Sequence, residues 1–339
     1  MKQTILVTGG AGYIGSWIVK LLVEQGNTVR VSVRDKSKTE KYQHILDLEK
    51  TNPGKVELWE ANLTTPNSFD EVAKGCDSII HVASPFTLDT KNAQENLINP
   101  ALQGTQNVLN AATKSGTVKR IVTTSSCAVI YSDNIDMSEK NLTEFTEEVN
   151  NTDSSISHNP YSYSKVLAEQ ESIKISKEQD QWSLAIINPA FVMGPGFAKE
   201  SNSGSITFMK EVLEGKYKMG APELYFCFVD VRDVAKAHIL ALENENAKGR
   251  HIICGANMTM LDMTKIIEKN YPKQFKLPKM KAPKFLMLLL YKVFGITKKY
   301  VQRNVGHSIF FNNAKSKREL GLEYTPFDKT IKDMVAWLK

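Results

Sequence analysis

Short apolar runs rich in β-branched residues alternate with amphipathic stretches along the first half of the chain. The apolar runs predict strands, and the stretches with apolar residues every three or four positions predict helices. The predicted strands cover residues 4–8, 29–33, 56–59, 78–82, 121–124 and 184–187. The predicted helices cover residues 13–24, 68–74, 94–114 and 161–177. Strands that alternate with helices form right-handed crossovers, so we expect an α/β fold with a doubly wound parallel sheet.

The alternation stops after Pro189, where we expect a second, smaller lobe to begin. The polar, acidic interval 131–159 predicts a loop with little regular structure, and a glycine-rich stretch at 194–204 leads into the second lobe. Short strands are predicted at 226–231 and 250–254, where the chain returns to the sheet, and Asp233 is expected to cap a helix that runs to about Leu242. We therefore expect a first domain at 1–188 and a lobe at 189–339, with residues 226–255 returning to the first domain.

The composition is that of a globular protein. Of the 339 residues, 42% are hydrophobic and 24% are charged, which excludes a disordered chain. The net charge of +6 is modest for this length, so we expect no nucleic-acid partner; a phosphorylated cofactor suits this charge as well. The N-terminus leaves no room for a secretion leader, and four scattered cysteines lack metal or redox spacing. These features predict a cytoplasmic protein with reduced thiols and no metal site.

The longest apolar run covers residues 285–290 and extends to Tyr291, Val293 and Phe294, about half the length that crosses a bilayer. Lysines precede it at positions 273, 276, 279, 281 and 284, a pattern also found in membrane-surface helices. We expect the run to form pocket wall and lobe packing instead, so membrane association is not predicted.

A glycine-rich loop, residues 8–15 with the sequence Thr-Gly-Gly-Ala-Gly-Tyr-Ile-Gly, lies between the first strand and the first helix. In this context Gly9 permits a tight turn, Gly12 lets the backbone approach a pyrophosphate, and Gly15 lets the helix pack closely on the strand. The helix start at Tyr13 and Ile14 then faces the negative charge. The loop predicts a dinucleotide cofactor.

The end of the second strand indicates which dinucleotide. An NAD site usually carries an acidic residue there for the ribose hydroxyls, whereas this chain has Val33 followed by Arg34. A guanidinium suits a 2′-phosphate, and Lys41 can reach the same group. Asp35 is the counter-argument, because it could accept the ribose hydroxyl. We predict NADP(H).

Tyr161 and Lys165 are spaced by one helical turn, which brings both side chains onto one helix face. A nearby ammonium favours phenolate over phenol, so the spacing predicts a tyrosine with a lowered pKa that acts as a proton donor. Tyr163 points elsewhere.

With the loop and this pair in place, the chain resembles the extended short-chain dehydrogenase/reductase family over nearly its whole length. Ser126 stands where that family keeps its catalytic serine, and residues 188–195 and 229–238 also match. Within the family the chain is most similar to the branch of dihydroflavonol reductases, cinnamoyl-CoA reductases and related microbial aldehyde and ketone reductases. Residues 29–35, 81–86 and 312–317 carry that likeness.

The resemblance implies a Rossmann fold, NADPH as cofactor, and roles for individual residues. It implies Arg34 at the 2′-phosphate, Lys165 on the nicotinamide ribose, and Ser126, Tyr161 and Lys165 as the catalytic set. Further cofactor contacts are implied for Asn62 and Leu63 beside adenine, for Val82, Ala83 and Ser84 along the cofactor, and for Pro189 near nicotinamide. Asn62 replaces an aspartate that is common in the family.

The substrate is not carried over. Tyr131 stands where the dihydroflavonol enzymes have an asparagine, and residues 159–163 depart from the cinnamoyl-CoA signature. Phe86, Tyr131 and Phe191 predict an apolar, partly aromatic pocket for a small carbonyl compound. Two alternatives stay open: an epimerase, dehydratase or hydroxysteroid dehydrogenase of the same family, and a non-catalytic NADP-sensing protein, which typically lacks the tyrosine-lysine pair. The sequence leaves a monomer or a homodimer open.

Overall fold

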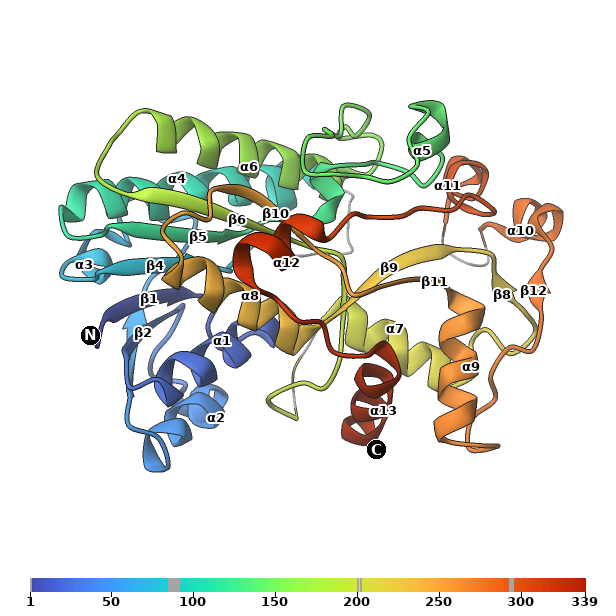
Figure 1. The fold of residues 1–339 in the computed structure, drawn as a ribbon, viewed down its shortest axis with the longest axis horizontal. Helices are drawn as coiled ribbons and strands as arrows, with labels where there is room; N and C mark the ends of the chain where they lie inside the picture. The colour runs from blue at the N-terminus through green and yellow to red at the C-terminus, as the bar shows by residue number, and fades with distance from the viewer. Residues whose placement is uncertain (1, 85–91, 200, 202, 293–295) are drawn as a thin grey trace.

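A parallel seven-stranded sheet organises the N-terminal part of the computed structural model, which describes residues 2–84, 92–199, 201, 203–292 and 296–339 (Figure 1). The strand order is β10-β6-β5-β4-β1-β2-β3, and all neighbours are parallel. The strands are β1 (Thr4–Thr8), β2 (Thr28–Val33), β3 (Lys55–Glu60), β4 (Ser78–His81), β5 (Arg120–Thr124), β6 (Ser183–Pro189) and β10 (Gly249–Ile253). The doubly wound fold predicted from the sequence is confirmed.

Helices cover both faces of this sheet, as Figure 1 shows. Because successive strand residues point to opposite faces, Ile5 and Val7 pack into one core while Leu6 packs into another. The first core lies under α1 (Tyr13–Glu24), α2 (Gln43–Leu46) and α8 (Val231–Glu243), and the second under α3 (Asp70–Ala73), α4 (Asn99–Ser115) and α6 (Pro160–Lys177). The strand order reverses between β1 and β4: β2 and β3 are added on one side of β1, and β4, β5 and β6 on the other. Ligands of such sheets bind at the carboxyl ends of the strands on either side of this point.

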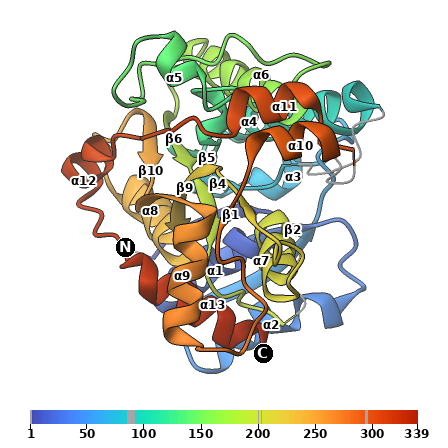
Figure 2. The same cartoon turned by 90° about the vertical axis from the view of Figure 1, so that its right-hand side faces the viewer.

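The C-terminal part adds two small sheets and a third core. One sheet has the order β11-β9-β7, from β7 (Phe191–Met193), β9 (Tyr225–Asp230) and β11 (Ala256–Thr259), and the other pairs β8 (Ala221–Pro222) with β12 (Lys281–Ala282). The helices of this part are α7 (Gly204–Leu213), α9 (Met260–Asn270), α10 (Lys284–Leu290), α11 (Lys298–Asn304) and α13 (Phe327–Leu338). In Figure 2, α10 and α11 lie above α7, on the side of the molecule that carries α4. The third core packs α7, α9 and α13 around Phe228 of β9.

Two local predictions were wrong. Of the two strands expected to return to the large sheet, only β10 does so, because β9 pairs with β7 and β11. The helix after β9 is capped by Asp230, whose carboxylate accepts the Arg232 N–H at 2.8 Å; Asp233 instead accepts the Thr325 N–H and hydroxyl. The helix predicted at 94–114 is confirmed, and its first residues form a π-helix (Gln94–Ile98) before α4. The interval 131–159 is largely irregular but contains α5 (Asp136–Glu139), and α12 (Ala314–Leu320) follows α11.

The apolar run at α10 was expected to be pocket wall and lobe packing. The packing is confirmed for one face of the helix, the pocket wall stays a prediction, and Val293 and Phe294 lie outside the described residues. Met287 is 4% exposed and packs on Val301 and Val305, whereas Phe285 is 68% and Leu289 is 73% exposed. Within the described ranges, the structure has no helix long and apolar enough to span a bilayer.

Candidate functional site

The glycine loop lies at the carboxyl end of β1 and requires its glycines. Gly9 has φ of +67°, and a Cβ there would lie 3.0 Å from the backbone of Ala83, so Ala83 and Gly9 touch. A Cβ on Gly15 would lie 2.1 Å from the Gly9 carbonyl oxygen, which no side chain can do. Gly12 is the N-cap of α1 and has no side chain to occupy the first-turn N–H groups. The helix start is therefore open to an anion.

Tyr13 and Ile14 were predicted to face the cofactor. The Tyr13 side chain points instead into the second lobe, where its hydroxyl donates to the Gly194 carbonyl at 2.7 Å, and burial raises its pKa. Ile14 is half-buried against the first and third cores. The predicted contact of these two residues with a phosphate therefore stays a prediction for their backbone N–H groups.

Arg34, which follows β2, and Lys41, in the short 3-10 helix Thr39–Tyr42, are both exposed. The carboxylate of Asp35 is already engaged: it accepts the Ser37 N–H at 3.0 Å and lies 2.9 Å from the Lys38 ammonium. The hydrogen bond from the Ser37 hydroxyl, followed by that from Lys38, lowers the pKa of Asp35 to about 2. This engagement weakens the argument that Asp35 holds a ribose; the contact of Arg34 with a cofactor stays a prediction.

The next strand ends carry the other predicted cofactor contacts. The Asn62 side-chain oxygen accepts from the Thr64 N–H at 3.1 Å, an Asx turn, and Leu63 packs on Gly104. Val82 follows β4 and its N–H donates to the Thr8 carbonyl at 3.3 Å; Ala83 and Ser84 come next, with the Ala83 N–H donating to the Thr8 hydroxyl at 3.1 Å. Phe86 lies outside the described residues.

The predicted catalytic set, Ser126, Tyr161 and Lys165, comes together where β5 ends and α6 begins. Ser126 follows β5 and forms a side-chain hydrogen bond with Tyr161, while its hydroxyl also accepts the Ala128 N–H at 3.1 Å. The Lys165 ammonium lies 6.0 Å from the centre of the Tyr161 ring. Lys165 is 7% exposed, whereas Ser126 and Tyr161 are half-buried, so the ammonium is shielded from water and the two hydroxyl residues are partly open to it.

The pKa values depart from the sequence-based expectation. Burial raises the pKa of Tyr161, and the hydrogen bond from Ser126 opposes that rise, so the expected lowering by Lys165 is not found in the chain without cofactor. Burial lowers the pKa of Lys165 to about 8, against the attraction of Glu169. At neutral pH the phenol therefore keeps its proton and the lysine remains an ammonium.

Sequence reasoning missed Glu169, a nearly buried carboxylate one turn beyond Lys165. It accepts Asn188 Nδ2 at 2.8 Å and Arg250 Nε at 2.6 Å. Asn188 in turn donates to the Ser126 carbonyl at 3.3 Å, just before Pro189 at the end of β6. The spacing of four from Lys165 was the available signal, because it places Glu169 on the same helix face. These contacts join α6 to β6 beneath the site.

The predicted apolar wall is divided between two clusters. The Tyr131 ring lies 5.4 Å from both Phe145 and Phe311, and burial raises its pKa. Phe191 of β7 has its ring 5.5 Å from Phe208 and 5.7 Å from Phe226. Both residues are half-buried, so each presents part of its side chain to solvent. Their contact with a substrate stays a prediction.

His81 and His238, expected to serve packing, are buried and hydrogen-bonded. His81 Nδ1 lies 2.7 Å from the Thr8 hydroxyl, and burial, followed by the charge of Lys165, lowers its pKa to about 3. His238 Nε2 lies 2.7 Å from the Thr124 hydroxyl, and burial lowers its pKa to about 4. Both imidazoles are therefore neutral at physiological pH. His81 links β4 to β1, and His238 links α8 to β5.

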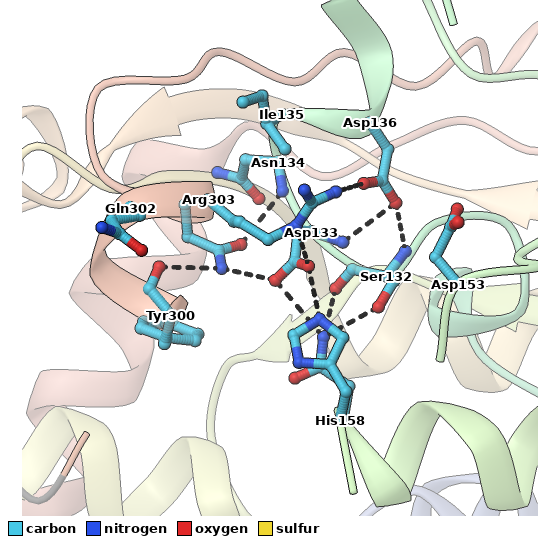
Figure 3. A network of polar contacts seen from close by, with 12 residues as sticks. Ser132, Asp133, Asn134, Ile135, Asp136, Asp153, His158, Tyr300, Gln302 and Arg303 are labelled. Carbon is cyan, nitrogen blue, oxygen red and sulfur yellow. Dashed lines mark hydrogen bonds and ion pairs between the residues drawn. The ribbon is translucent and has the colours of Figure 1, made fainter. Parts of the chain in front are cut away.

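A second polar group that sequence reasoning missed surrounds Asp133, in the interval read as a loop (Figure 3). Its buried carboxylate accepts His158 Nε2 and Asn304 Nδ2, both at 2.7 Å, and Arg303 Nε at 2.8 Å. No local signal could have found it, because its members are separated by up to 171 positions in the chain.

Comparisons of the sequence and of the structure with known proteins agree on the family of this chain. Residues 5–255 match the model of the NAD dependent epimerase/dehydratase family. A cinnamoyl-CoA reductase of Medicago truncatula is 34% identical over 100% of this chain and 96% of its own. The Gre2–NADPH complex of Candida albicans has a TM-score of 0.78 at 28% identity, covering 99% of this chain and 98% of its own. Yeast methylglyoxal/isovaleraldehyde reductase Gre2, also complexed with NADPH, has a TM-score of 0.77 at 27% identity with the same coverage of both chains. The chain therefore belongs to the NAD-dependent epimerase/dehydratase family, the extended short-chain dehydrogenases/reductases, and lies among its reductases.

Proposed function

We propose that the protein is an NADPH-dependent reductase that converts an aldehyde or ketone of a small apolar or aromatic substrate into the alcohol, with Tyr161 as proton donor. The observation that carries this proposal is the hydrogen bond between Ser126 and Tyr161 beside the buried Lys165 ammonium. The reductase relatives and the two NADPH complexes support the same reading.

The residues present fit a dinucleotide cofactor with a 2′-phosphate. The glycine loop excludes side chains where a pyrophosphate approaches, since Cβ atoms on Gly9 and Gly15 would collide with backbone. The Asp35 carboxylate is bound by Ser37 and Lys38, so it does not compete with a 2′-phosphate for Arg34. Lys41 is nearby in the chain. We infer that Arg34 and Lys41 bind the 2′-phosphate, that Asn62 and Leu63 flank adenine, and that Val82, Ala83, Ser84 and Pro189 line the rest.

When bound, NADPH supplies a hydride to the carbonyl carbon. The chain's own residues handle the charge that develops on the carbonyl oxygen. Tyr161 donates its phenolic proton to that oxygen, and Ser126 donates a hydrogen bond to the resulting charge. Lys165 holds the nicotinamide ribose, and its ammonium stabilises the phenolate left on Tyr161. The raised pKa of Tyr161 keeps the proton in place until the substrate arrives.

We propose that the substrate binds between the lobe at 189–339, which contributes Phe191, and the first domain, which contributes Tyr131 and, as a prediction from the sequence alone, Phe86. The aromatic surroundings of Phe191 favour an apolar or aromatic carbonyl compound. The names of the relatives cover an aromatic thioester and two small aldehydes, so both belong in the test. A cytoplasmic location and a monomeric or homodimeric state stay predictions.

The test is the oxidation of NADPH by the purified protein with a panel of short aldehydes, diketones, aryl ketones and an aromatic thioester. Wild type should turn over at least one of them, and Tyr161→Phe should lower kcat about 100-fold or more, the usual contribution of a general acid. Arg34→Ala should lower kcat/KM for NADPH about 10- to 100-fold and leave NADH use unchanged, since it removes a charge-assisted hydrogen bond. Equal inertness of wild type and Tyr161→Phe, or tightly bound NAD in the purified protein, would count against the proposal.

A further inference from the structure

The Asp133 network joins three parts of the molecule that are distant in sequence (Figure 3). The carboxylate belongs to the segment that follows Ser126, His158 immediately precedes the helix of Tyr161, and Arg303 and Asn304 belong to α11 of the C-terminal part. Arg303 also bonds Asp136 at 2.9 Å. Within this network, the buried Asp133 carboxylate accepts hydrogen bonds both from the segment before α6 and from α11.

The network reaches Tyr161 through Asn159. Asn159 has φ of +53°, in the left-handed region that asparagine adopts more readily than other non-glycine residues. Its side-chain amide donates to the Ser132 carbonyl at 2.8 Å and lies 3.4 Å from Asp133 Oδ1. Its own carbonyl accepts the Tyr163 N–H at 3.0 Å, the first hydrogen bond of α6. The conformation at Asn159 therefore sets the direction in which α6, and with it Tyr161, begins.

The segment before Asn159 is fixed to the same carboxylate. His158 pairs with Ser155 through two backbone hydrogen bonds of 2.7 and 3.1 Å, so the segment forms a narrow turn ahead of Asn159. The turn would be free to swing if Asp133 released the His158 ring. Burial raises the pKa of Asp133, but the hydrogen bonds from Asn304, His158 and Arg303 outweigh it and lower the pKa, so the carboxylate is charged. A charged, buried acceptor makes strong hydrogen bonds to these donors.

We propose that Asp133 is a positioning residue for Tyr161: by binding His158, Arg303 and Asn304 at once, it fixes the left-handed turn at Asn159 and ties the proton donor to α11 of the C-terminal lobe. The assignment rests on the proposed reductase function. It extends that function by making the placement of the proton donor depend on the packing of the lobe that receives the substrate. An error of about 1 Å in such placement costs about 100-fold in rate.

The test compares Asp133→Asn with Asp233→Asn, a matched control. Asp233 is also buried and also accepts two hydrogen bonds, both from Thr325, on the far side of the sheet from α6. We expect Asp133→Asn to lower kcat about 10- to 100-fold with unchanged NADPH affinity, and Asp233→Asn to lower stability without lowering kcat. A kcat for Asp133→Asn within about twofold of wild type, or an equal loss in both variants, overturns the proposal.

His158 supplies a second pair of variants in case Asp133→Asn does not fold. His158→Gln keeps an N–H donor for Asp133, and His158→Leu removes it. Lower kcat for the leucine variant with near wild-type kcat for the glutamine variant supports the proposal, whereas equal rates in the two variants refute it.

Hydrogen exchange separates this proposal from the reductase assignment. In protein without substrate, the peptide covering residues 158–166 should exchange faster in Asp133→Asn, or in His158→Leu, than in wild type and in Asp233→Asn. If wild type reduces no carbonyl compound, the proposed function fails while this readout still decides whether Asp133 holds the start of α6. Unchanged exchange in both variants overturns the positioning role.

Discussion

Replacing Lys165 by methionine should stabilise the cofactor-free protein while abolishing carbonyl reduction. Lys165 is 7% exposed, and burial lowers its pKa from 10.5 to about 8 against the attraction of Glu169. Within the described part of the chain no carboxylate forms an ion pair with it, because Glu169 is taken by Asn188 and Arg250. The fold therefore bears the cost of a charged group that it does not compensate.

The magnitude follows from the two pKa values. The difference between 10.5 and about 8 corresponds to about 3 kcal/mol, at about 1.4 kcal/mol for each pH unit. Below pH 8 the lysine is protonated in both states, so the folded state bears the whole cost. Between pH 8 and 10.5 the unfolded state binds more protons than the folded state, so the stability of wild type rises and the cost disappears. Methionine should thus gain about 3 kcal/mol at pH 6.5 but only about 1.4 kcal/mol at pH 9.5.

The assay is thermal unfolding of wild type and Lys165→Met without cofactor at these two pH values. An unfolding entropy of about 2.1 cal/mol/K per residue converts the gains into Tm increases of about 4 °C and about 2 °C for a chain of this length. Lys177→Met is the control, because this lysine lies on the same helix but is exposed; its Tm change should be small and independent of pH. A lower Tm for Lys165→Met at pH 6.5, or a gain that does not shrink at pH 9.5, refutes the reasoning.

Three further changes test other parts of the structure. Gly15→Ala should weaken NADPH binding strongly in a fluorescence titration, because the added Cβ collides with the Gly9 carbonyl. Gly75→Ala is the control: the position has a positive φ but open space around it, so this variant should lose only about 1 kcal/mol of stability and no NADPH affinity. Glu169→Ala should lower the unfolding free energy in urea by about 3–5 kcal/mol, since two buried donors lose their acceptor; a loss below about 1 kcal/mol would contradict this. Met287→Ala should cost about 2–5 kcal/mol in the same assay and Phe285→Ala less than about 0.5, as their exposures imply.

Local patterns were sufficient to predict the large sheet and the glycine loop. β1 and α1 begin and end where the sequence predicted, because both carry uninterrupted periodicity and are bounded by glycines. The pair of Tyr161 and Lys165 was found for the same reason, since a spacing of four on a helix is a local property. The second lobe lacked such signals. β9 has the composition of a sheet strand, and only tertiary packing decides that it joins β7 rather than the large sheet.

The predicted direction of the Tyr161 pKa failed for a related reason. A sequence shows that an ammonium stands near a phenol, but not how deeply both are buried. In the structure burial has the larger effect on both groups, and burial depends on β5, β6 and the segment after Ser126 together. The Asp133 network could not be predicted at all, because α11 lies about half the chain away from the residues that it binds.

Two buried charged residues of this region, Asp133 and Lys165, illustrate how structural and functional polar residues differ. Asp133 is surrounded by donors from His158, Arg303 and Asn304, so its burial is compensated and it can hold elements together. Lys165 is 7% exposed, but its attracting carboxylate, Glu169, bonds Asn188 and Arg250, so the ammonium keeps a capacity for ion pairing that no carboxylate of the described residues uses. Such capacity costs stability unless a ligand fills it. The same reasoning explains why removing Asp133 should displace Tyr161, whereas removing the charge of Lys165 should abolish carbonyl reduction and increase the free energy of unfolding.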